Sequence, residues 1–130
     1  MVTRYHLDTD FLILALGRGG SERVRLLGLC DAGQLIEMSS IAWYEFTRGP
    51  RTAEQIGIAR ALFGVDGIVP FSEALAEQAG RQFRALGQPR RRAADIAIGV
   101  VAVSREAVLL TCNGRDFAGI EGLRLEEFKA

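Results

Sequence analysis

Four acidic residues, far apart in the sequence, could together bind a divalent cation. They are Asp8, Glu45, Asp95 and Asp116. Carboxylates that gather at one place repel one another, so a protein that holds several there normally supplies a cation to neutralise them. Oxygen ligands suit Mg²⁺ or Mn²⁺. The chemistry expected of such a site is hydrolysis of a phosphodiester, in which the metal lowers the pKa of a bound water and stabilises charge on the leaving oxygen.

Each acid also has a purely structural explanation. Asp8 could cap the helix that follows it, because Asp is a favoured N-cap residue. Asp95 opens a predicted helix, where the helix dipole favours an acid. Glu45 could pair with Arg48, which lies three residues on and on the same helical face. Asp116 lies in a turn rich in Asn, Gly and Asp, a composition common to loops. Only the fold can separate these explanations from a shared site.

The elements that must position the acids alternate between strands and helices. Strands are predicted over 4–7, 34–38, 67–71 and 107–111, with an edge strand over 123–125. Helices are predicted over 9–16, 22–29, 41–48, 52–62, 73–86 and 93–103, with N-caps at Ser21, at Ser39 or Ser40, and at Ser72. This order predicts an α/β fold, in which a mostly parallel sheet of about five strands lies between helices. Ligands of such sheets bind at the carboxyl ends of the strands, where Asp8 and Asp116 are expected.

Composition narrows the class of protein. The length of 130 residues, with 48% hydrophobic and 25% charged residues, predicts one globular domain over 1–130. Because 16 basic residues balance 16 acidic ones, binding through bulk positive charge is excluded. Cys30 and Cys112 are too few for a disulfide framework and favour a reduced, cytoplasmic setting. The single histidine, His6, excludes a multi-histidine zinc site. The early apolar run over 11–16 is too short to span a membrane.

Four short motifs occur in an order that resembles the PIN-domain ribonucleases. They are Leu7-Asp8-Thr9-Asp10, Glu45 followed by Arg48-Gly49, the segment 94–98 that holds Asp95, and the segment 111–117 that holds Asp116. Each motif is only a few residues long, but four in this order, in a chain of this length, are specific. The resemblance covers nearly the whole chain. In size and layout the chain is similar to the single-domain VapC toxins of VapBC toxin–antitoxin pairs.

The resemblance implies a fold, an activity and partners. The fold is a PIN domain, with a three-layer α/β/α arrangement around a mostly parallel sheet. The activity is that of an endoribonuclease dependent on Mg²⁺ or Mn²⁺. The partners are an RNA substrate, a cognate antitoxin protein and a second copy of the chain in a homodimer, without a membrane.

The resemblance also implies roles for individual residues. The acidic quartet of the family is matched by Asp8, Glu45, Asp95 and Asp116. Asp8 and Asp95 are expected to ligate the metal directly, and Asp116 through water. The supporting polar residues are matched by Thr9, Thr111 and Asn113. Asp10 stands where the family often has Asn or Ser, so we leave it outside the core site.

Arg90, Arg91 and Arg92 come just before Asp95 and form a local basic stretch. Their guanidinium groups could hold RNA phosphates through bidentate hydrogen bonds, or they could form an ordinary solvated face. Two other classes of protein remain as alternatives. A receiver-type signalling domain shares the sheet and the acids, but it needs a lysine after a late strand, and the only lysine here is Lys129. A catalytically silent PIN-fold module that binds RNA or a partner is the second alternative.

Overall fold

The computed structural model describes residues 2–17 and 20–128. Within these residues one sheet has the strand order β3-β2-β1-β4-β5, and every neighbouring pair is parallel. The strands are β1 (Arg4–Leu7), β2 (Leu35–Ser39), β3 (Ile68–Val69), β4 (Val108–Thr111) and β5 (Arg124–Glu127). The first strand in the sequence is therefore the central strand of the sheet, with β2 and β4 on either side.

The helices begin and end close to the predicted positions. They are α1 (Thr9–Leu16), α2 (Ser21–Asp31), α3 (Ser40–Thr47), α4 (Ala53–Ala61), α5 (Glu73–Ala85) and α6 (Ala93–Ser104), with 3₁₀ turns η1 (Arg90–Arg92) and η2 (Gly114–Phe117). Ser39 and Ser72 cap α3 and α5 by accepting a hydrogen bond from a main-chain N–H, as predicted. The predicted cap at Ser21 is wrong. Gly20 holds the N-cap position of α2 at φ 88°, a conformation that favours glycine, and Ser21 is already helical.

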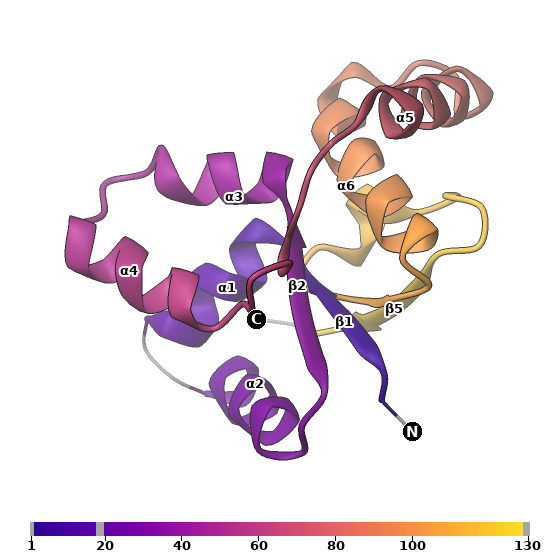
Figure 1. The fold of residues 1–130 in the computed structure, drawn as a ribbon. Coiled ribbons are helices and arrows are strands. Elements are labelled where there is room, and N and C mark those ends of the chain that lie inside the picture. Colours follow the sequence, from indigo (N-terminus) through magenta and orange to yellow (C-terminus); the bar gives the residue numbers. More distant parts are fainter. Residues whose placement is uncertain (1, 18–19, 129–130) are drawn as a thin grey trace.

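Helices cover both faces of the sheet, with α1 to α4 on one side of the central strands and α5 and α6 on the other (Figure 1). Neighbouring residues of β1 show the same division. The ring of Tyr5 meets Arg25 of α2, whereas His6 bonds Glu37, which pairs with Arg105 at the end of α6. Because alternate residues of a strand point to opposite faces, α2 and α6 lie on opposite sides. The three-layer α/β/α arrangement around a parallel five-stranded sheet is therefore confirmed.

The core packs on both faces of the sheet, beneath α1 to α4 on one side and mainly beneath α6 on the other. Ile96 to Ala102 are all buried, which explains why this helix is apolar on every side.

Strand β3 is shorter than predicted, because Pro70 follows it and has no N–H to donate to a neighbouring strand. Among the described residues, no helix combines the length and the apolar character needed to cross a lipid bilayer.

A buried ionic cluster ties β1 and β2 to the end of α6. The Glu37 carboxylate is nearly inaccessible, with the residue 3% exposed, and lies 3.1 Å from His6 Nδ1 and 3.1 Å from Arg105 Nη2. Burial opposes the charged form of Glu37, but the hydrogen bonds from His6 and Arg105 outweigh it and lower the pKa of this carboxyl. The cluster therefore holds a negative charge inside the protein by pairing it.

Candidate active site

All four predicted acids line one cavity of about 430 Å³ at the carboxyl edge of the sheet. They come from four separate segments. Asp8 directly follows β1, and Glu45 lies on α3, which follows β2. Asp95 lies in the first turn of α6, and Asp116 lies on η2, which follows β4. The structure thus brings together the acids that the sequence keeps apart.

Asp8 is buried at the floor of this arrangement and both of its carboxylate oxygens accept hydrogen bonds. Oδ1 accepts from the main-chain N–H of Phe11 at 2.8 Å, which caps α1, and Oδ2 accepts from the Thr111 hydroxyl at 2.5 Å. Burial raises the pKa of Asp8 to about 6, although both hydrogen bonds favour the charged form. The capping explanation of Asp8 is therefore correct, and it does not exclude a place in the cavity.

Asp95 shows how closely the acids are gathered. Burial, followed by the charges of Asp116 and Glu45, raises the pKa of Asp95 to about 7. The ion pairs found within residues 2–17 and 20–128 involve Glu37 and Glu126, and none of the four acids takes part in one. In the part of the chain that the structure describes, the negative charge of the cavity thus has no protein cation paired to it.

Glu45 is held by a contact from another helix. Its Oε1 accepts a hydrogen bond from the Thr9 hydroxyl at 2.8 Å. Arg48 instead places its guanidinium over the Tyr44 ring, 5.4 Å from the ring centre. The structure therefore gives no support to the explanation of Glu45 as the partner of Arg48 in an ion pair.

Each of the three predicted polar residues donates a hydrogen bond to an acid of the cavity, and each to a different acid. Thr111 contacts Asp8 and Thr9 contacts Glu45, whereas the Asn113 side-chain amide donates to Asp10 Oδ2 at 2.6 Å. Asp10 also lines the cavity, so the structure adds a fifth acid to the site. Its position two residues after Asp8, at the start of α1, is the sequence signal that could have included it.

The donor set fits a divalent ion of the hard class. The acids offer oxygen atoms only, which suits Mg²⁺ or Mn²⁺, and their charge is otherwise uncompensated in the described residues. No group of three or more His, Cys, Asp or Glu side chains in those residues lies close enough to ligate one ion together. Mg²⁺ usually keeps several waters and takes one or two carboxylates, so the cavity fits an ion held partly through water.

Two arginines other than the predicted ones line the acidic cavity. The cavity is not lined by any of the three predicted arginines, Arg90, Arg91 and Arg92. Arg92 donates hydrogen bonds to the main-chain carbonyls of Asp116, in η2, and of Ala118, which follows η2. Arg48 and Arg51 line the cavity instead. Arg51 donates to the Phe46 carbonyl at 2.8 Å, and its guanidinium lies 4.4 Å from the centre of the Phe46 ring. The Arg-Gly-Pro-Arg run after α3 is the signal that could have identified this pair.

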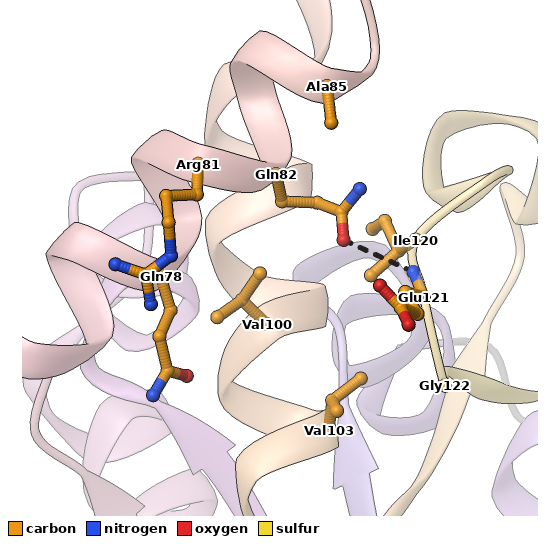
Figure 2. Close-up of a pocket in the computed structure, with 9 residues that line it drawn as sticks. All are labelled: Gln78, Arg81, Gln82, Ala85, Val100, Val103, Ile120, Glu121 and Gly122. Atoms are coloured by element: carbon orange, nitrogen blue, oxygen red, sulfur yellow. Dashed lines mark hydrogen bonds between the residues drawn. The ribbon is translucent and has the colours of Figure 1, made fainter.

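A larger cavity of about 590 Å³ lies between α5, α6 and the segment 120–122 (Figure 2). Gln82 of α5 crosses its edge and accepts a hydrogen bond from the Glu121 main-chain N–H at 3.2 Å. Val100 and Val103 of α6 form an apolar floor. This cavity contains no cluster of carboxylates, so we place the candidate active site in the smaller, acidic cavity.

Comparison with known proteins defines the class. The family model of the PIN domain matches residues 5–123, and the chain therefore belongs to the PIN domain family. No curated protein matches the chain in sequence.

Several solved structures share the fold. VapBC2 from Rickettsia felis, bound to a DNA fragment from the promoter, is 21% identical with a TM-score of 0.74, over 98% of this chain and 100% of that one. VapBC-1 from nontypeable Haemophilus influenzae is 20% identical with a TM-score of 0.68, over 96% and 98%. A toxin–antitoxin complex from Klebsiella pneumoniae is 23% identical with a TM-score of 0.68, over 97% and 99%. The PIN fold expected from the sequence motifs is confirmed.

Proposed function

We propose that this PIN domain, taken as one domain over 1–130, is a divalent-metal-dependent endoribonuclease of the cytoplasm. The observation that carries the proposal is the convergence of Asp8, Glu45, Asp95 and Asp116 on one cavity. Membership of the PIN family supports a nuclease. The fold shared with VapBC complexes supports the more specific role of a toxin in a type II toxin–antitoxin system.

The side chains of the cavity have distinct proposed tasks. Asp8 and Asp95 ligate Mg²⁺ or Mn²⁺, and Asp116 contributes through water. Such an ion, when bound, activates a water and stabilises the charge that develops on the phosphodiester. The Phe11 N–H and the Thr111 hydroxyl fix the orientation of the Asp8 carboxylate, and Thr9 does the same for Glu45.

Binding of RNA requires cations opposite these acids. Arg48 and Arg51 lie in the cavity wall, and a guanidinium can hold a phosphate with two parallel hydrogen bonds. Arg90 and Arg91 are exposed on η1 and remain candidates for contacts with more distant phosphates. The neutral chain would thus bind RNA through placed arginines, since its net charge supplies no general attraction.

We propose that the antitoxin binds in an apolar groove beside the active site. This groove, of about 290 Å³, is lined in part by Leu16, Phe46 and Ile58, and it shares Ile13, Pro50 and Arg51 with the acidic cavity. A protein segment bound in the groove would extend into the active site and exclude RNA. We also propose that the active form is a homodimer.

The test is cleavage of structured RNA by the purified chain with Mg²⁺. EDTA should abolish cleavage, and Asp8→Asn and Asp95→Asn should each reduce it at least about a hundredfold while the unfolding transition is retained. Asp66→Asn is the matched control, because Asp66 is exposed and outside the cavity. Cleavage that survives both cavity substitutions would rule out the proposed chemistry. RNA binding without cleavage by the unmodified chain would favour the silent module instead.

A further inference from the structure

Arg92 joins the segments that carry two of the acids. It is the N-cap residue of α6, three residues before Asp95. Its Nε donates to the main-chain carbonyl of Asp116 at 2.9 Å, and its Nη2 donates to the carbonyl of Ala118. One guanidinium therefore links the start of the helix that bears Asp95 to the turn that bears Asp116.

We infer that Arg92 is a positioning residue that sets the separation of Asp95 and Asp116 and thereby the affinity of the cavity for a divalent cation. The inference rests on the proposed function, and it assigns Arg92 a task different from phosphate binding. A planar guanidinium presents its donors in a rigid fork and can hold two carbonyls at a fixed separation, whereas an ammonium group is a compact donor on a flexible stem and fixes that separation less well.

The hydrogen bonds of Arg92 fix the backbone of Asp116 and leave its carboxylate available. Within the described residues the Asp116 side chain forms neither an ion pair nor a hydrogen bond to another side chain. The acid can therefore face the cavity while its main chain is held. Because Asp95 and Asp116 carry like charges, an attachment of this kind opposes the repulsion that would otherwise drive the two segments apart.

A second contact between the same two segments supports this arrangement. A Cβ atom added at Gly99 of α6 would lie 2.6 Å from Ile120 Cδ1 and 3.5 Å from Phe117 Cδ1. The segment after Asp116 thus packs directly on α6, where the absence of a side chain at position 99 makes room. Gly119, at φ 82°, lets the chain turn between the two attachments. Arg92 holds the main chain of Asp116 and Ala118, and the space at Gly99 receives the side chains of Phe117 and Ile120.

Arg91 provides a matched control on the same turn. It has the same side chain, lies one residue away and is exposed. The test compares Arg92→Ala, Arg92→Lys and Arg91→Ala in the full chain, with the Mg²⁺ dissociation constant measured by calorimetry without RNA. We expect Arg92→Ala to weaken Mg²⁺ binding about tenfold, the loss typical when a group that orients metal ligands is removed. The Mg²⁺ dissociation constant of Arg91→Ala should stay within about twofold of that of the unmodified chain. The constant of Arg92→Lys should fall between those of the two Ala variants.

Kinetics with RNA separates positioning from substrate binding. Arg92→Ala should lower kcat and leave KM for RNA unchanged, and higher Mg²⁺ concentrations should restore part of the rate. Unchanged Mg²⁺ affinity in folded Arg92→Ala would overturn the inference. If that variant does not fold, unmodified affinity in Arg92→Lys would overturn it equally. If Mg²⁺ affinity is unchanged in the variant but the unmodified chain cleaves RNA normally, only the role of Arg92 is wrong and the proposed function stands. If the unmodified chain binds no Mg²⁺, the role of Arg92 and the proposed function are both wrong.

Discussion

The Thr111 hydroxyl donates a hydrogen bond to Asp8 at 2.5 Å, between residues that are 103 positions apart in the sequence. The Thr111 oxygen in turn accepts from the Asn113 main-chain N–H at 2.9 Å, so its orientation is fixed. The bond ties the end of β1 to the end of β4 and sets the direction of a buried carboxylate. It is therefore a structural link and a part of the site at the same time.

Replacement of Thr111 by Val should destabilise the chain at neutral pH by about 1 to 2 kcal/mol, because the buried Asp8 carboxylate loses one of its two partners. It should also raise the pKa of Asp8 further, since the Thr111 hydrogen bond lowers that pKa. Urea unfolding measures the first effect. Thr47→Val is the control, because the Thr47 hydroxyl bonds only a carbonyl of its own helix. Equal losses in both variants would show that Thr111 has no special contact with Asp8.

Without metal, the free energy of unfolding should fall as the pH rises from about 5 to about 8. The pKa values of Asp8 and Asp95 are raised to about 6 and about 7, so in this range the folded state binds more protons than the unfolded state. For Asp8 the loss is on the order of 2 kcal/mol. The stabilisation from Glu37, whose pKa is lowered, is lost only at more acidic pH.

Thermal unfolding in EDTA and in millimolar Mg²⁺ measures this pH dependence. Mg²⁺ should stabilise the protein more at about pH 8 than at about pH 5, because at low pH protons compete for the same carboxylates. The double variant Asp8→Asn with Asp95→Asn should be nearly insensitive to pH in this range. A metal-free protein that gains stability toward pH 8 would contradict the expectation.

Glu37→Gln should destabilise the chain by about 2 kcal/mol, because the neutral amide loses the charge-assisted hydrogen bonds that the buried carboxylate makes with His6 and Arg105. The affinity for Mg²⁺ should not change, since Glu37 does not line the acidic cavity. Chemical unfolding and calorimetry measure the two effects. Glu126→Gln is the control, because Glu126 and its partner Arg25 are partly exposed and should contribute less than about 1 kcal/mol. The expectation is wrong if the two variants lose the same stability.

Ile58→Arg should separate inhibition from catalysis. Ile58 lies in the proposed antitoxin groove and is 56% exposed, so a charged side chain there can be solvated without disturbing the fold. Binding of the proposed antitoxin, measured by calorimetry with the small protein that co-purifies with the chain from its native cells, should weaken at least about tenfold. RNA cleavage should stay within about twofold. Val65→Arg, at a 93% exposed position outside the groove, should change neither. Normal inhibition of the Ile58 variant would exclude the groove.

The fold was accessible from the sequence because local signals agreed with it. The uniformly apolar segment of α6 and the short apolar segment of β4 predicted buried elements, and both lie in the core. The serine N-caps of α3 and α5 were predicted correctly, because there the residue before the serine does not take the N-cap position itself. At α2 the positive φ of Gly20 moved the cap one residue earlier, and hydrogen-bonding preference alone does not reveal a backbone angle.

Contacts between segments that are distant in the sequence could not be predicted from it as well. Spacing within one helix suggested Arg48 as the partner of Glu45, but the partner is Thr9, on a helix 36 residues earlier. The sequence also presents Arg90, Arg91 and Arg92 as equivalent. Only the docking of η2 against the start of α6 distinguishes Arg92, because its carbonyl partners are created by that docking.

The position of β1 has a consequence for the synthesis of the chain. This strand leaves the ribosome first, yet its neighbour β4 and the turn that holds Asp116 come near the end of the described sequence. Parallel pairing of such distant segments must wait until both are available. A nascent chain that has not reached β4 thus carries Asp8 and Glu45 without a formed cavity. If the domain is a nuclease, an unfinished chain therefore cannot yet cleave RNA.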